Sequence, residues 1–338
     1  MKERFAYIDY AKALAIIMVV TGHIIYFSIF EKDGIKADTL LIEQILKSVQ
    51  MPLFVFCSGL VVRSVALSVY DTLTDIYKRF RLLIVPFLVV GGFFALITYT
   101  TPDYFLSKGM KLGYWYLLTL FELYILHHVY LQISKLWFKR KEAILYDVLI
   151  GGGVFFIIRY LYRGVEAEIS CWQNMLSILQ LVRYYPYFFI ATLIKKYDLA
   201  EMVFSNKWFH AISLLTSVII LYANTHGIHI PGRTYVLPIT LLLTVLYVMR
   251  YLERSGNNRI KNILDYIGRH TLDIYIFHYF FIATLNISFL SQLLETNNGF
   301  TLSLLLILPW VALVITLSLL LGKIVRSSNI LNNIIFFK

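Results

Sequence analysis

The sequence predicts an all-α integral membrane protein, a bundle of about ten transmembrane helices. Two observations carry this fold class. Hydrophobic residues make up 59% of the 338 positions and charged residues only 15%, whereas soluble proteins carry about 25% charged residues. In addition, apolar stretches of roughly membrane length follow one another along the chain, and a helix needs about 20 mostly apolar residues to cross a bilayer.

Ten stretches meet this length criterion, and the loops between them are short. They are 10–30, 42–62, 82–100, 113–134, 143–160, 173–194, 208–225, 234–252, 270–290 and 302–322. No segment outside them is long enough for a soluble domain, so we predict a single membrane domain over residues 1–338. Lys2 and Arg4 precede the first stretch as in a signal peptide, but no small-residue cleavage site follows it. We therefore expect this stretch to remain as the first span.

The formal net charge of +11 indicates topology, because the lysines and arginines gather between the apolar spans and not on one soluble face. With the N-terminus inside, 22 of the 31 Lys and Arg residues lie on inner segments, 8 lie on outer segments, and Arg183 lies within the membrane. This asymmetry follows the positive-inside rule. It predicts that both termini are cytoplasmic and argues against nucleic acid as a partner.

The first span carries an ionisable side chain, His23, eleven residues after Lys12. At about 100° per residue this spacing returns to nearly the same helix face, and at 1.5 Å per residue it places the imidazole about 16 Å deeper. Ionisable groups inside a bilayer are costly and mark functional sites. We interpret His23 as a general base, the alternative being a histidine that only packs. Asp9 shares this face and is spaced to pair with Lys12 at i, i+3.

A second constellation follows the second span, where Lys78, Arg79 and Arg81 precede the third. Together with Lys12 they put four cations at the inner membrane face, and Arg and Lys bind phosphate through charge-assisted hydrogen bonds. A polyphosphate ligand held there needs an arm of about 16 Å to reach His23. The pantetheine arm of coenzyme A has about that reach. The alternative is that these cations only anchor the topology.

Further polar residues lie inside the predicted spans. Glu122 and Arg183 sit near mid-depth of the fourth and sixth spans, where they either form a buried pair that joins helices or contact a substrate. Tyr275 and His278 on the ninth span are candidates to line the site. The two cysteines show neither a metal-binding nor a disulfide spacing, and we expect no metal site.

Short motifs with these residues follow one another in a fixed order. They are Arg4 to Asp9, Lys12-x10-His23, Met51-Pro52-Leu53-Phe54 with Ser58-Gly59, the basic run ending Arg81-Leu82-Leu83-Ile84-Val85-Pro86, Tyr114-Trp115-Tyr116-Leu117, and Tyr266-Ile267-Gly268-x6-Tyr275-Ile276-Phe277-His278. The ordered set resembles acyltransferase family 3, the multi-pass membrane O-acetyltransferases of surface glycans. The family commonly has Arg-x-x-Arg where this chain has Lys78-x-x-Arg81, and Lys makes no bidentate contact.

The resemblance implies an acyl-CoA-dependent O-acyltransferase in the bacterial cytoplasmic membrane. The donor is acyl-CoA, usually acetyl-CoA, with no permanently bound cofactor; the acceptor is a hydroxyl of a cell-surface or lipid-linked carbohydrate, and membrane lipid surrounds the protein. The expected site residues are His23 and Glu122 for catalysis, Lys12, Lys78, Arg79, Arg81 and Ser58 for the donor, and Asp9, Arg183, Tyr275 and His278 for lining the substrate site.

A transporter or flippase for a glycolipid or another amphiphile is the alternative function, with His23, Glu122 and Arg183 as a relay. It predicts transport without CoA binding, and the two halves of the chain lack the internal repeat that many transporters carry. A purely structural scaffold leaves the ionisable residues within the spans unexplained. The sequence leaves open which acceptor is used, whether the chain forms a homo-oligomer and whether His23 itself becomes acylated.

Overall fold

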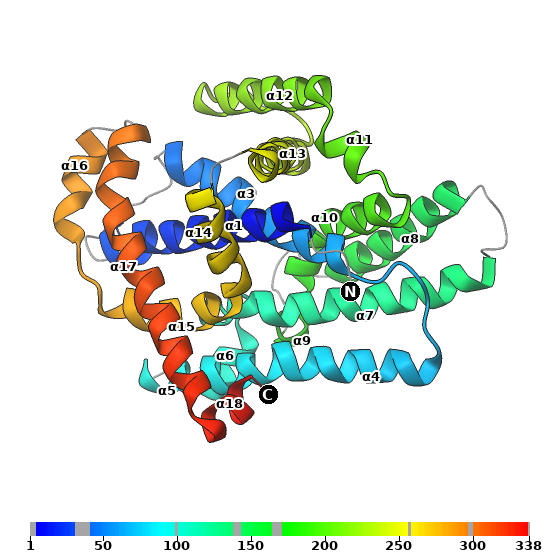
Figure 1. Ribbon diagram of the computed structural model, residues 1–338, viewed down its shortest axis with the longest axis horizontal. Coiled ribbons are helices and arrows are strands. Elements are labelled where there is room, and N and C mark those ends of the chain that lie inside the picture. Colours follow the sequence, from blue (N-terminus) through cyan, green and yellow to red (C-terminus); the bar gives the residue numbers. More distant parts are fainter. Residues whose placement is uncertain are drawn as a thin grey trace. The chain divides into compact units, whose positions relative to one another are not determined.

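Every element in the described part of the computed structural model is helical, as the composition predicts (Figure 1). The described residues are 5–30, 41–98, 101–137, 143–163, 171–255, 258–296 and 300–336. Contacts divide the chain into two units. Unit 1 comprises Met1–Cys57 and Asp198–Gly322, and unit 2 comprises Ser58–Tyr197 and Lys323–Lys338.

Unit 1 holds the first helix and most of the C-terminal third. Its elements are α1 (Ala6–His23), the π segment η1 (Ile24–Phe30), most of α3 (Leu41–Val61), α11 (Ala200–Phe204), α12 (Lys207–Thr225), α13 (Arg233–Arg254), α14 (Asn258–Arg269), α15 (Thr271–Thr284), the 3-10 turn η6 (Ser288–Leu290), α16 (Ser291–Thr296) and most of α17 (Phe300–Ser327). Within this unit, α1 contacts α13, α14 and α15 (Figure 1).

Small residues allow the neighbours of α1 to approach it closely. Ala11, Ala13 and Ala15 are completely buried, and small side chains are what close helix packing in a membrane requires. On the facing helix, a Cβ added to Gly268 would lie 2.2 Å from the backbone oxygen of Asp9. The glycine of the C-terminal motif is therefore the point at which α14 rests on the backbone of the N-terminal motif.

The start of α1 is capped from a distant helix. Its N-cap residue, Phe5, provides no side-chain hydrogen bond, so the first backbone N–H groups need other acceptors. Glu253 near the end of α13 supplies one, because its Oε1 accepts from the Tyr7 N–H at 3.1 Å. Arg250, one turn earlier on α13, lies over the Tyr7 ring at 4.9 Å. The N-terminal end of α1 is thus held by α13.

Unit 2 holds the middle of the chain. Its elements are α4 (Val69–Arg79), the π segments η3 (Phe80–Ile84) and η4 (Phe87–Gly91), α5 (Gly92–Ile97), α6 (Pro102–Ser107), the 3-10 turn η5 (Lys111–Gly113), α7 (Trp115–Trp137), α8 (Ala143–Arg163), α9 (Cys171–Met175), α10 (Ile178–Lys196) and α18 (Asn329–Ile335). Helix α7 runs beside α4 and also contacts α8 and α10 (Figure 1).

Polar side chains fix α7 to the segment that leads into α4. His127 Nε2 lies 2.8 Å from the Arg63 carbonyl, and Gln132 Nε2 donates to the Leu67 carbonyl at 2.9 Å. These bonds satisfy buried polar groups that would be costly to leave unpaired. They also hold the basic residues at the end of α4 in a fixed position against α7.

The described residues contain seven helices that are long and apolar enough to cross a membrane, or eight if the bent pair after His270 is one span. The chain is therefore a multi-pass membrane protein, but ten spans are not established. Helices α7 and α10 cover two of the predicted spans and are 23 and 19 residues long. Neither is among the seven, because polar side chains such as Glu122 and Arg183 lower their mean hydropathy.

The third span differs most from its prediction. It extends over Val69–Ile97, whereas the apolar stretch predicts 82–100, so it begins well before the basic residues. Two π segments, η3 and η4, lie within it. A π turn is seldom identifiable from composition because it depends on how neighbouring helices pack. As a result Lys78, Arg79 and Arg81 lie within the helix rather than ahead of it.

Candidate active site

His23 is the last residue of α1, and the backbone changes from α to π geometry directly after it. π segments are rare and occur frequently at functional sites. Here two hydrogen bonds tie η1 to α15 and to the segment that follows it. Ser28 Oγ donates to the Ile282 carbonyl at 3.3 Å, and the Ile287 N–H donates to the Ser28 carbonyl at 3.1 Å. The segment after His23 is therefore fixed against the helix that faces the imidazole.

Among the described residues, the half-buried imidazole of His23 lies between three aromatic rings and makes one short polar contact. Its Nε2 is 2.9 Å from the Tyr279 hydroxyl oxygen. Phe27, one turn later, stacks on the imidazole with ring centroids 5.6 Å apart, and the His278 ring lies 5.4 Å away. The site offers a histidine with a defined orientation in largely apolar surroundings.

The tautomer of His278 follows from its contacts. This side chain is completely buried, and its Nδ1 lies 3.0 Å from the Ile274 carbonyl and 2.8 Å from the Tyr275 carbonyl. Because a carbonyl only accepts, Nδ1 carries the proton and Nε2 is an acceptor. Among the described residues, that Nε2 has no hydrogen-bond partner. Such an atom is exceptional in a folded protein, so His278 is a candidate to accept from a substrate group.

A second polar atom of this kind lies beside α1. A Cβ on Gly22, the residue before His23, would lie 3.2 Å from Gln50 Oε1, so the glycine leaves room for the Gln50 amide. Gln50 Oε1 is buried and, within the described ranges, accepts no hydrogen bond. Unit 1 thus presents unpaired polar atoms from α3 and α15 near the end of α1.

Asp9 and Lys12 form the pair that their spacing predicts. Lys12 Nζ lies 3.8 Å from Asp9 Oδ1, and the side chains are 22% and 14% exposed. At i, i+3 the two side chains lie on one face of α1. Lys12 therefore remains partly accessible, with the Asp9 carboxylate beside it. Arg4, which begins the N-terminal motif, lies outside the described residues.

In unit 2, Arg79 is held by two groups, one of which is itself fixed by a histidine. Its guanidinium carbon lies 4.0 Å from the centre of the Tyr124 ring, and its Nε lies 3.6 Å from Asp75 Oδ2. His128 Nε2 approaches the same carboxylate oxygen at 3.0 Å. Cation–π stacking and an ion pair together orient a guanidinium more strictly than either contact alone. Arg79 is therefore a pre-oriented cation at the start of a π segment.

The other predicted donor residues are placed less strictly. Lys78 is exposed, whereas Arg81 lies over the Tyr77 ring at 5.6 Å. Ser58, at the end of α3, is buried, and its hydroxyl lies 3.3 Å from that of Tyr116. The next residue, Gly59, allows α3 to contact α10, because a Cβ there would lie 2.5 Å from the Phe188 carbonyl oxygen.

Glu122 lies near a buried lysine. Lys111 is completely buried, and its ammonium donates to the Asn174 carbonyl at 2.5 Å. Burial lowers the pKa of Lys111 to about 8, and attraction to the Glu122 carboxylate opposes that shift. Glu122 Oε2 is itself buried and has no hydrogen-bond partner in the described part of the chain. No ion pair joins Glu122 to the exposed Arg183 among these residues, so the proposed helix-joining pair is not formed.

The predicted site residues fall into the two units. Unit 1 contains Asp9, Lys12, His23, Tyr275 and His278, and unit 2 contains Ser58, Lys78, Arg79, Arg81, Glu122 and Arg183. Within unit 1 the structure brings His23 and His278 together. Within unit 2 it groups Arg79 with residues of α7. The convergence of all four predicted donor cations stays a prediction.

Sequence reasoning did not identify Tyr279, Asp75 or Tyr124. Tyr279 directly follows His278, so the polar character of that motif extends one residue further than expected. Asp75 precedes Arg79 by four residues, the spacing of a helical ion pair, and this signal was available in the sequence. No local spacing indicates that Tyr124 lies under Arg79, because the two residues belong to different helices.

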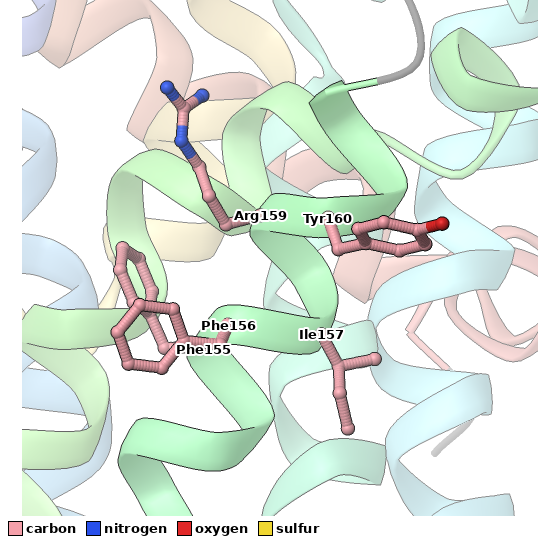
Figure 2. Close-up of a pocket in the computed structure, with 5 residues that line it drawn as sticks. All are labelled: Phe155, Phe156, Ile157, Arg159 and Tyr160. Carbon is pink, nitrogen blue, oxygen red and sulfur yellow. The ribbon is translucent and has the colours of Figure 1, made fainter.

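Neither a pocket on α8 nor a metal-binding group adds to the candidate active site among the described residues. A pocket of about 600 Å³ lies along α8 and is lined by Phe155, Phe156, Ile157, Arg159 and Tyr160 (Figure 2). All of its lining side chains come from one helix, and none is a predicted site residue. Among the described residues, no group of three or more His, Cys, Asp or Glu is placed to hold a metal ion.

The fold and these side chains define a multi-pass membrane protein with an imidazole in apolar surroundings and a pre-oriented arginine. The family model described as Acyltransferase domain, that of acyltransferase family 3, matches residues 5–323. Because the match covers nearly the whole chain, this protein belongs to that family, and it is a membrane acyltransferase. No significant match is found among curated proteins or solved structures.

Proposed function

We propose that the protein transfers an acyl group, specifically acetyl, from acyl-CoA to a hydroxyl of a cell-surface or lipid-linked carbohydrate. The observation that carries this proposal is the His23 imidazole at the α-to-π transition, with a single short polar contact in the described part of the chain, in a protein of an acyltransferase family. A group that must accept and return a proton needs a free lone pair and little competing hydrogen bonding.

In the proposed reaction His23 removes the proton from the acceptor hydroxyl. The hydroxyl oxygen attacks the thioester carbonyl, the C–S bond breaks, and the departing thiolate of coenzyme A receives the proton from the imidazolium. A neutral imidazole has one N–H and one lone pair. If Nε2–H donates to Tyr279, Nδ1 is the free base and Tyr279 stabilises the imidazolium. Tyr279 is thus a positioning residue.

The donor's phosphates are assigned to Lys12, Lys78, Arg79 and Arg81, with Ser58 near them. Arg79 supports this assignment best, since its fork is oriented by Asp75 and Tyr124 and a planar guanidinium matches a phosphate's oxygens. A partly exposed Lys12 suits the same role.

The remaining predicted residues are assigned to the acceptor. His278 Nε2 is a buried acceptor without a partner among the described residues, which suits a sugar hydroxyl that donates to it. Tyr275 lies beside it, with ring centroids 5.9 Å apart. Glu122 is proposed as a second catalytic carboxylate, supported by its unpaired oxygen. Asp9 and Arg183 complete the proposed lining.

Calorimetry with acetyl-CoA and coenzyme A tests the donor assignment. Detergent-purified wild-type protein is compared with a Lys78/Arg79/Arg81 triple alanine variant. The matched control replaces three exposed lysines that the topology also places inside, Lys135, Lys207 and Lys323. We expect saturable binding by the wild type and the control, and at least a tenfold loss in the triple variant. The absence of binding by folded wild-type protein, or equal losses in both variants, would overturn the assignment.

A further inference from the structure

A groove of about 510 Å³ lies in unit 1 between α1, α14 and α17. Val311 and Ile315 are among its buried lining residues, and both belong to α17. Ile263 and Tyr266 of α14 also line it and are 54% and 51% exposed. The groove is therefore apolar and open on the side of α14.

We expect the groove to border the hydrocarbon of the membrane. Two of its three walls, α1 and α17, belong to the candidate membrane spans Ala6–Ile29 and Leu304–Ser327. An apolar surface at that depth faces lipid chains and not water. The groove is also separate from the proposed catalytic line. Ile17 lines it and follows Lys12 by five residues, which places it about 140° around the helix from the Lys12 face.

Helix α14 has the pattern of a helix that lies at a membrane surface. Ile260, Ile263 and Tyr266 recur every three residues and are all exposed. The polar positions hold three cations and one carboxylate, Arg259, Lys261, Arg269 and Asp265. A short amphipathic helix with a basic polar face binds in the plane of the interface and attracts anionic head groups.

The cations of α14 are only partly compensated. Arg269 pairs with Asp265 at 2.6 Å, whereas Lys261 Nζ donates to backbone carbonyls, those of Glu253 at 2.7 Å and of Ser255. Arg259 is exposed. Asn262 lines the groove as well, so a polar amide lies close to these cations along the helix. Charge complementarity thus favours an anionic occupant.

We propose that this groove binds the hydrocarbon tail of an anionic phospholipid, with the phosphate of its head group at Arg259 and Arg269 of α14. The site is distinct from the proposed donor and acceptor sites and does not depend on the proposed reaction. The lipid fills the space between α14 and α17 and so stabilises the groove that these two helices form with α1.

The test measures stabilisation of purified protein by added lipid. Thermal unfolding in detergent is followed while phosphatidylglycerol or the zwitterionic phosphatidylcholine is titrated. Phosphatidylglycerol is expected to act at a roughly 30-fold lower concentration, because α14 has a net excess of two cations and each contributes roughly a factor of five. An Arg259→Gln/Arg269→Gln variant changes only surface side chains and is expected to lose this preference.

Filling the groove provides the second arm. Ala312 lines the groove and is exposed, so Ala312→Trp is expected to abolish saturable stabilisation by lipid. The matched control is Leu320→Trp, because Leu320 lies on the same helix, is 51% exposed and is not part of the lining. Equal responses to both lipids in wild-type protein, or a loss in the control as large as in Ala312→Trp, would overturn the proposal. If Ala312→Trp does not fold, the arginine variant decides alone.

Discussion

His23 and Arg79 occupy similar positions in their units but are surrounded differently. Each stands where an α-helix becomes a π segment, His23 before η1 and Arg79 before η3. Within the described ranges, His23 has one short polar contact, to Tyr279, and its other neighbours are rings such as that of Phe27. Arg79 is held by a carboxylate and a ring. The difference fits two tasks, because a base must change its protonation state, whereas a binding cation must only stay in place.

The largest expected effect is on the reacting group. His23→Ala removes the proposed base and is expected to lower the rate of acyl transfer by about 10²- to 10⁴-fold. Thermal stability should change little, since the side chain is half-buried. Activity and the melting temperature are measured together. The control is His226→Ala in an exposed position; full activity in a folded His23→Ala protein would remove the catalytic role.

Tyr279→Phe tests whether the single polar contact of His23 matters. A hydrogen bond to a charged partner contributes about 1.5–3 kcal/mol, so the loss of this hydroxyl should reduce kcat roughly 10- to 150-fold. KM should stay constant, and the lower limb of the pH–rate profile should move, which a merely structural role would not cause. An unchanged profile with a reduced melting temperature would contradict the positioning role.

Gly268→Ala tests the packing of α14 against α1, the helix that ends at His23. Its Cβ would lie 2.2 Å from a backbone oxygen of α1, and backbone cannot move aside easily. We expect a loss of roughly 1–3 kcal/mol in the free energy of unfolding. The control is Gly153→Ala in α8, where a Cβ meets nothing within 4 Å. That substitution should be neutral or stabilise by up to about 1 kcal/mol. Equal melting temperatures would contradict the close approach.

Arg79→Lys tests whether the orientation of the guanidinium matters, because the substitution keeps the positive charge. Lysine loses the planar fork and much of the contact with Tyr124, so the KM for acyl-CoA should rise about tenfold at constant kcat. Arg159→Lys serves as the control, because Arg159 is exposed, belongs to none of the proposed sites and keeps its charge. Steady-state kinetics at fixed salt distinguish the two. An unchanged KM in Arg79→Lys would indicate that only net charge matters, and an equal rise in both variants would indicate an effect that is not specific to Arg79.

The smallest expected effect concerns an exposed ion pair outside both sites. Hydrogen bonds from Arg254 and Arg250 lower the pKa of Glu201 to about 2, from an ordinary value of 4.5. Because the folded state holds the lower pKa, the stabilisation is complete above about pH 4.5 and is lost as the pH falls toward 2. Glu201→Gln should therefore reduce the melting temperature at pH 7 but flatten its decline in acid. For a 60% exposed carboxylate the effect is about 1 kcal/mol or less, and parallel curves for both proteins would contradict it.

The sequence predicts the parts of this picture that depend on local spacing. The apolar stretches predict helices. The Asp9–Lys12 pair follows from its i, i+3 spacing, which places both side chains on one helix face. The π segments, the Tyr279 contact and the position of Tyr124 under Arg79 depend on which helices meet. A local pattern contains no information on that, since His23 and Tyr279 are 256 positions apart. The same reason leaves the convergence of Lys12 with the cations of unit 2 as a prediction.

The support of α1 by helices from the last third of the chain has a consequence for biosynthesis. The helix that carries His23 is synthesised well before Gly268 and Tyr279, which contact it. At about 5–20 residues per second, the 256 positions between His23 and Tyr279 correspond to about 13–50 s of translation. During that interval α1 lacks its contacts with α14 and α15, which fix its position and orient His23. The nascent chain therefore acquires its reactive centre late, when α14 and α15 have been inserted.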